Sequence, residues 1–183
     1  MDTTKIGAVG GRGGLIWEQE RDELAGIFVS YCEDKVYSLQ FLNCVNGNFV
    51  SSEKYGSPHC KFYSAVILNY PSEFLTSISG SFERVNKKSF FSALSPTRDL
   101  TVLRAIKFST NKGSYGPFGT PSSDGNNNID FNFVIGNPQF LGGFHGTKNC
   151  DGIESIGFYM KNIPSSLIKK DLPVQDEKEK EKD

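Results

Sequence analysis

The apolar residues of this sequence recur with a period of two and almost never with the period of a helix, and this constrains the fold more than any other feature. Apolar and polar residues alternate from Tyr37 to Phe41, from Ile129 to Ile135 and from Ser155 to Met160. Alternating residues lie on one face of an extended strand. Each of these segments is therefore predicted to be a half-buried β-strand.

Four further segments contain apolar and aromatic runs of strand length and are also predicted to be strands: Gly26–Cys32, Lys61–Tyr70, Phe74–Phe82 and Thr101–Thr110. Turn-forming pairs such as Asn46-Gly47 and Asn137-Pro138 separate the strand candidates. Short strands at this spacing predict an all-β sandwich, barrel or prism.

Length and composition predict one folded domain followed by a tail. The chain has 183 residues, 13% of them aromatic, which is long enough to bury a core. Residues 1–163 are assigned to the domain. Residues 164–183 end in the mixed-charge run DLPVQDEKEKEKD, which is predicted to be a solvated, disordered tail. The longer connection Asn86–Arg98 contains Phe90-Phe91, for which core packing and a contact patch both stay open.

Charge and hydropathy exclude several classes of partner. The formal net charge is −1, from 20 basic and 21 acidic residues, whereas nucleic-acid binders usually carry a basic face. No stretch approaches the roughly 20 apolar residues that a membrane helix needs. No apolar run follows the N-terminus, so no secretory signal is expected and the predicted location is the cytoplasm. The four cysteines contain no C-x-x-C pair and are expected to be reduced and structural.

Few residues could carry catalysis. The only histidines are His59 and His145, and neither lies at zinc-ligand spacing from a cysteine. No nucleophile with a matching base can be assembled, and the glycine-rich run Gly10–Gly14 lacks the Lys-Ser/Thr ending of a P-loop. The chain is therefore predicted not to be an enzyme and to need no metal or cofactor. Glycine-rich loops, polar clusters and neutral charge suit a hydroxyl-rich ligand such as a sugar, although many interaction domains share this inventory.

Several motifs within residues 5–163 resemble, in order, those of the plant jacalin-related lectins. The opening Lys5–Glu18, KIGAVGGRGGLIWE, is similar to the start of that family. The further matches are LNYPSEFLTSISG from Leu68, IKFSTNK from Ile106, YGPFG from Tyr115, GFHG from Gly143 and IGFY from Ile156. Each motif alone is weak, but the ordered set is specific.

The resemblance implies a β-prism, in which three four-stranded Greek-key sheets surround a pseudo-threefold axis and the N-terminal strand lies beside the C-terminal strands. It also implies a metal-independent sugar site at one end of the prism. The uncut glycine loop resembles that of the single-chain, mannose-type branch, which is nucleocytoplasmic. In that branch a loop N–H that here corresponds to Gly14 holds the sugar, and a G-x-x-x-D loop before the last strand supplies the remaining contacts.

The second half of the implied site departs from the family pattern. The matching window is CDGIE, in which Cys150 stands at the glycine position and Glu154 at that of the ligand aspartate. Sugar sites depend on close placement of their acceptors, and a Glu carboxylate reaches further than an Asp carboxylate. The predicted carbohydrate-binding residues are Gly14, Asp151, Gly152 and Glu154, with Asp151 as the alternative acceptor. A solvated strand entry that binds nothing is an equally open interpretation of Asp151 and Glu154.

Three functions are compatible with these residues. The first is a cytosolic, mannose- or glucose-type plant lectin in defence or stress recognition, whose weak single sites would require a homo-oligomer. The alternative is a jacalin-fold interaction protein in antiviral defence that has lost sugar binding and has protein partners. The run Gln139–Thr147 and the charged tail resemble a smaller subgroup of the family, which includes a protein that restricts potyvirus movement. A hydrolase using Glu154 and Asp151 is the third class.

Overall fold

The computed structural model describes residues 2–87, 98–121 and 127–162. Within these ranges the chain forms thirteen strands and one short 3-10 turn, η2. Their bounds are β1 Thr3–Gly10, β2 Leu15–Gln19, β3 Leu24–Tyr31, β4 Val36–Val45, β5 Asn48–Ser51, β6 Tyr55–Gly56, β7 Phe62–Ile67, β8 Leu75–Lys87, β9 Arg98–Thr110, β10 Ser114–Gly119, β11 Asn128–Val134, η2 Pro138–Phe140, β12 Leu141–Asn149 and β13 Gly152–Lys161. The predicted tail and Phe90-Phe91 lie outside the described residues. No helix in the described ranges is long and apolar enough to cross a membrane.

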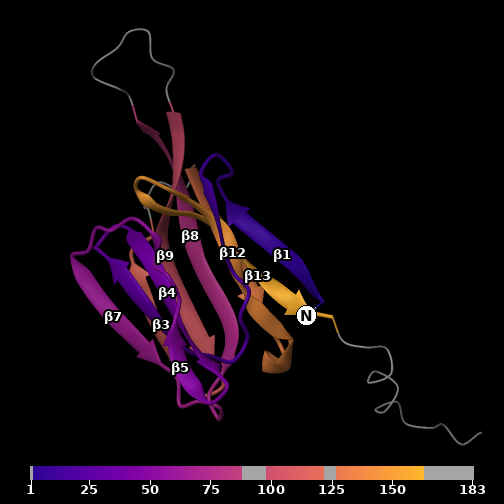
Figure 1. The fold of residues 1–183 in the computed structure, drawn as a ribbon. Helices are drawn as coiled ribbons and strands as arrows, with labels where there is room; N and C mark the ends of the chain where they lie inside the picture. Colours follow the sequence, from indigo (N-terminus) through magenta and orange to yellow (C-terminus); the bar gives the residue numbers. More distant parts are fainter. Residues whose placement is uncertain (1, 88–97, 122–126, 163–183) are drawn as a thin grey trace, which may run out of the picture.

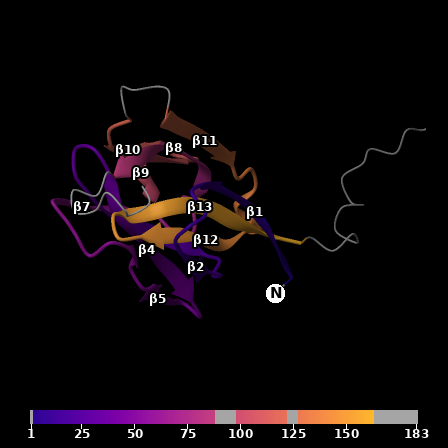
Figure 2. The same cartoon turned by 90° about the horizontal axis from the view of Figure 1, so that it is seen from above.

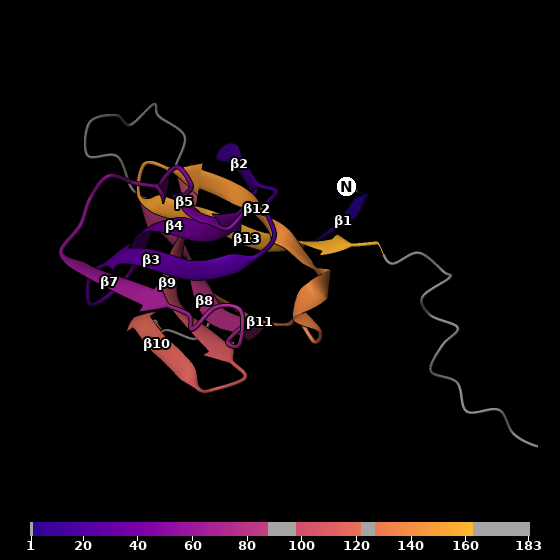
Figure 3. The ribbon, with the colours of Figure 1, turned by 60° about the horizontal axis from the view of Figure 1, so that its bottom comes forward.

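The strands form three antiparallel sheets (Figures 1 and 2). Sheet A has the order β1-β13-β12-β2, sheet B the order β5-β4-β3-β7 with β6 paired to β4, and sheet C the order β10-β9-β8-β11. The N-terminal strand β1 pairs with the C-terminal strand β13, from Thr3 opposite Lys161 to Gly10 opposite Ser155 (Figure 3). The expected all-β prism is confirmed.

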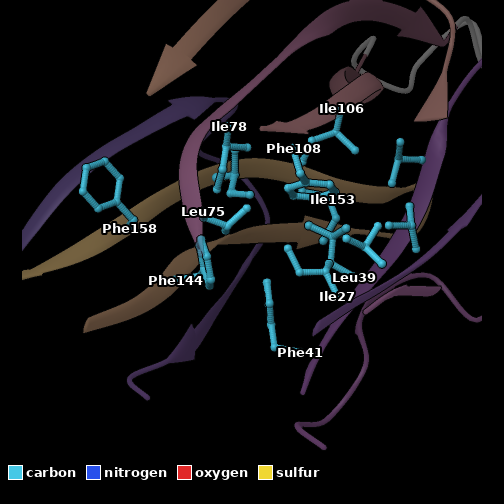
Figure 4. Close-up of a cluster of buried hydrophobic side chains, with 14 of the residues drawn as sticks. Ile27, Leu39, Phe41, Leu75, Ile78, Ile106, Phe108, Phe144, Ile153 and Phe158 are labelled. Carbon is cyan, nitrogen blue, oxygen red and sulfur yellow. The ribbon is translucent and has the colours of Figure 1, made fainter. Parts of the chain in front are cut away.

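One hydrophobic core joins the three sheets, because each sheet turns its apolar face inward (Figure 4). Phe41 of β4 and Phe144 of β12 stack with ring centroids 4.5 Å apart and an interplanar angle of 9°. Ile78 and Phe108 add apolar surface from sheet C. Such aromatic pairs contribute about 0.5–1.5 kcal/mol beyond the area that they bury.

The period-two prediction is confirmed for β11 and only partly for β13. In β11, Phe131 is buried while Asp130 and Asn132 are exposed. In β13, Ile156 and Phe158 are buried as expected, but Ser155 and Tyr159 on the other face are buried as well, and Met160 is exposed. The outer face of this strand is covered by side chains of the flanking strands and by the glycine loop, as described below.

Strand direction places two connections at one end of sheet A. β1 and β12 run toward this end, and β2 and β13 start from it. The glycine loop between β1 and β2 and the turn between β12 and β13 therefore meet there. The opposite end carries η2, the end of β13 and the connection from β2 to β3.

Candidate functional site

The glycine loop lies directly on the backbone of β12 and β13. Gly11 N donates a 2.9 Å hydrogen bond to Glu154 O. A Cβ at Gly10, where φ is +120°, would lie 2.3 Å from that same carbonyl oxygen, and a Cβ at Gly14 would lie 2.3 Å from Lys148 O. Only glycine permits both approaches, so the loop composition follows from this backbone contact.

The Glu154 carboxylate fills the cradle of the glycine loop. Gly14 N donates a 2.6 Å hydrogen bond to Glu154 Oε2, and the Glu154 residue is only 4% exposed. A Cβ at Gly11 would lie 2.7 Å from Glu154 Cγ, so the side chain runs against the loop. A hydrogen bond between an amide and a buried carboxylate is charge-assisted and strong. The N–H that the resemblance assigns to a sugar therefore has a partner within the chain.

The turn between β12 and β13 is organised by Asn149. Its Oδ1 accepts hydrogen bonds from Asp151 N at 2.9 Å and Gly152 N at 3.2 Å, and its Nδ2 donates to Thr101 O at 2.9 Å. An Asn side chain that bonds the backbone two residues ahead forms an Asx turn. The backbone N–H groups of two predicted site residues, Asp151 and Gly152, therefore both have a hydrogen-bond partner within the chain.

The Asp151 carboxylate points toward sheet B and forms an ion pair with Lys35, with Nζ 3.4 Å from Oδ1. Lys35 Nζ also lies 5.2 Å from the centroid of the Tyr37 ring. A hydrogen bond with Cys32 and burial raise the pKa of Tyr37 to about 12, so this phenol is neutral. Lys35 therefore lies between the Tyr37 ring and the Asp151 carboxylate. Because Asp151 pairs with Lys35, its carboxylate is not available as the alternative sugar acceptor beside the glycine loop.

Of the four predicted site residues, Gly14 and Glu154 are in direct contact, whereas Asp151 and Gly152 are bonded to other partners. The residues that sequence reasoning missed are Asn149, Thr101 and Lys35. Asn149 carries a sequence signal, since Asn before a turn commonly bonds its own backbone. Lys35 carries none, because its partner lies 116 residues away in another sheet.

A hollow of about 430 Å³ adjoins the glycine loop on the outer face of sheet A. Lys5 of β1 and Glu18 of β2 form an ion pair across it, and their hydrogen bond raises the pKa of Lys5 and lowers that of Glu18. His145 lies beneath this pair, 7% exposed, and its Nε2 has no hydrogen-bond partner among residues 2–87, 98–121 and 127–162. Burial lowers the pKa of His145, so the ring is neutral at pH 7. These side chains cover β13 from outside.

A family model described as the Jacalin-like lectin domain matches residues 6–159. That match spans most of the chain and agrees with the three-sheet fold. The chain therefore belongs to the jacalin-like lectin family.

Among curated relatives, the chain is 34% identical over 147 residues to "Protein RESTRICTED TEV MOVEMENT 1" of Arabidopsis thaliana, covering 80% of this chain and 75% of the relative. It is 30% identical over 167 residues to "Jacalin-related lectin 2" of the same plant, covering 86% and 85% of the two chains. Among solved structures, the artocarpin–mannopentose complex is similar with a TM-score of 0.69 and 30% identity, covering 88% of this chain and 99% of that chain.

Proposed function

We propose that this chain is a jacalin-fold interaction protein in antiviral defence, whose sugar site is closed by its own Glu154. The observation that carries the proposal is the 2.6 Å hydrogen bond from Gly14 N to Glu154 Oε2. The carboxylate lies where a sugar hydroxyl would have to approach the loop N–H. The Glu154 carboxylate thus takes the hydrogen bond that a sugar hydroxyl would otherwise accept from Gly14 N.

The free energy needed to break the hydrogen bond between Glu154 and Gly14 weakens sugar binding at this site. A hydrogen bond to a charged group contributes about 1.5–3 kcal/mol net, and each 1.4 kcal/mol is a factor of ten in affinity. A sugar that must first break the Glu154–Gly14 bond therefore binds about 10- to 150-fold more weakly than at an open site. Starting from the millimolar affinity expected of one shallow site, this raises the dissociation constant to about 10 mM or above.

The relatives support a role in defence. One relative at 34% identity carries the name "Protein RESTRICTED TEV MOVEMENT 1", and a second at 33% identity is named as an inactive form of it. We place the chain in the same functional class, with protein partners in the cytoplasm, and with the nucleus as a second location.

The test is calorimetric titration with methyl α-mannoside, together with retention on immobilised mannose. Wild-type protein is expected to bind about 10- to 150-fold more weakly than Glu154→Asp, so that its heat does not reach saturation at about 20 mM sugar. In Glu154→Asp the shorter carboxylate cannot reach Gly14 N as Glu154 does, and millimolar binding is expected to appear. Glu53→Asp, which shortens an exposed acid elsewhere on the surface, is the matched control and is expected to behave as wild type. Equal binding by wild type and Glu154→Asp, or no gain in Glu154→Asp, would contradict the proposal.

A mannose- or glucose-type lectin is the second candidate, because the glycine loop is intact and the artocarpin structure solved with mannopentose is 30% identical. In this case Glu154 would rotate away from Gly14 and accept hydrogen bonds from two sugar hydroxyls. Retention of the wild-type protein by mannose resin, with a homo-oligomer in light scattering, would support this candidate. Elution by free methyl α-mannoside would show that the retention is specific.

A further inference from the structure

A second hollow lies at the end of the prism opposite the glycine loop, where β2 and β13 end and β12 begins. Its volume is about 450 Å³, which lies within the range of small-ligand pockets. The connections from β2 to β3 and from β7 to β8 form its walls together with the start of β12. None of the predicted site residues contributes to it.

The floor and one wall of this end pocket are apolar. Leu24, Leu75 and Leu141 are buried beneath it, and the rings of Tyr70 and Phe74 line one side. The rings of Tyr70 and Phe49 make an edge-to-face contact with centroids 6.4 Å apart, and this contact fixes the orientation of the Tyr70 ring. A leucine floor with an aromatic wall suits the aliphatic stem of a long side chain.

The polar lining of the end pocket is acidic. Three carboxylates, those of Asp22, Glu23 and Glu73, line it against one basic side chain, Lys161. Lys161 is already paired with Asp22, Nζ lying 2.6 Å from Oδ2. Neither Glu23 nor Glu73 takes part in an ion pair found in residues 2–87, 98–121 and 127–162.

The charge of Glu73 is fixed by neutral donors. Asn69 N donates to Oε2 at 3.1 Å, and the hydroxyls of Thr110 and Tyr115 donate to Oε1 at 2.8 and 2.9 Å. These bonds lower the pKa of Glu73, which stays ionised although the residue is only 6% exposed. Glu73 thus carries its charge without forming an ion pair in the described part of the chain, and together with Glu23 it makes the pocket attractive to positive charge.

We infer that the end pocket receives an arginine side chain of a partner protein. The guanidinium would pair with the exposed Glu23 carboxylate and stack on the Tyr70 ring, while its methylene stem covers the leucine floor. An uncharged sugar would leave the excess negative charge uncompensated. The inference rests on the proposed function only in taking a protein as the partner, and it involves a different end of the prism.

The probe is the peptide acetyl-Gly-Arg-Gly-amide, and its control contains citrulline, which has the shape of arginine without the charge. Binding is followed by amide chemical shifts in two-dimensional NMR spectra of the full chain. The arginine peptide is expected to shift the amides of Glu23, Tyr70 and Leu75 saturably. The citrulline peptide is expected to bind at least about fivefold more weakly than the arginine peptide, since the charge supplies the main attraction.

Two variants locate the binding. Glu23→Gln and Tyr70→Ala are each expected to weaken the arginine peptide about three- to tenfold. Glu20→Gln removes an exposed carboxylate outside the end pocket and is expected to leave the affinity unchanged. Equal binding of the arginine and citrulline peptides, shifts outside the end pocket, or shifts of these same amides by methyl α-mannoside would overturn the inference. Mannose binding at Gly14 would instead overturn only the proposed function.

Discussion

The turn beside the candidate site should depend on one side chain, Asn149. Its amide accepts two backbone N–H groups of the turn and donates to Thr101 O in β9, with distances of 2.9, 3.2 and 2.9 Å. Asn149→Ala removes all three hydrogen bonds at once. It changes no backbone atom of β12 or β13, whose last pair is Asn149 opposite Gly152.

Each bond contributes about 0.5–1.5 kcal/mol net, and water can replace part of what is lost at this surface turn. The free energy of unfolding is therefore expected to fall by about 2–3 kcal/mol. For a domain of this size that corresponds to a fall in Tm of about 5–10 °C. Asn149→Asp keeps the Oδ acceptor and loses only the donor to Thr101, so it should lose about 1 kcal/mol.

The assay is urea unfolding, and the variants are compared where they share the m-value of the wild type. About 0.5 M salt is present to screen the new carboxylate of Asn149→Asp from Asp151. Asn48→Ala is the control, since the Asn48 side chain makes a single exposed bond of 3.4 Å to Asn46 O. It should change stability by less than about 0.5 kcal/mol. A loss below about 0.5 kcal/mol in Asn149→Ala, or a loss in Asn149→Asp as large as in Asn149→Ala, would refute the assignment of three bonds to this side chain.

Three further outcomes are expected. Burial lowers the pKa of His145, so the folded state binds fewer protons and stability should fall as the pH drops below about 6.5; His145→Gln should remove this slope in thermal melts. Phe144→Ala deletes the ring stacked on Phe41 at 4.5 Å and should cost about 3–5 kcal/mol in urea unfolding, whereas a loss under 1 kcal/mol would contradict the shared core. Gly11→Ala places a Cβ 2.7 Å from Glu154 Cγ and should cost about 1–3 kcal/mol, and an unchanged Tm would contradict that close approach.

The strand content could be predicted because it depends on local alternation. In β11 the residues on one face are apolar and those on the other, Val134 excepted, are polar, so Phe131 and Asp130 could be assigned to opposite faces. The burial of β13 could not be predicted from its own residues. Its outer face is covered by Lys5 and Glu18, whose strands lie on either side of the central pair only after sheet A has formed.

The position of the candidate site could be predicted from the sequence, but the hydrogen bond that closes it could not. The resemblance brought Gly14 and the window ending in Glu154 to one end of the prism, and the structure places them in contact. That they bond one another depends on the length of the Glu154 side chain and on how closely the glycine loop approaches β13, and neither can be read from the sequence. The same holds for Lys35 and Asp151, which meet through the packing of sheet A against sheet B.

The hydrogen bond from Gly14 N to Glu154 Oε2 is tested most directly by the amide signal of Gly14 in NMR spectra. In the wild-type protein this amide should exchange slowly with solvent and keep its chemical shift as methyl α-mannoside is added. In Glu154→Asp it should exchange faster and shift saturably with the sugar. A rapidly exchanging Gly14 amide in the wild-type protein, or a saturable shift with the sugar, would contradict the closed site.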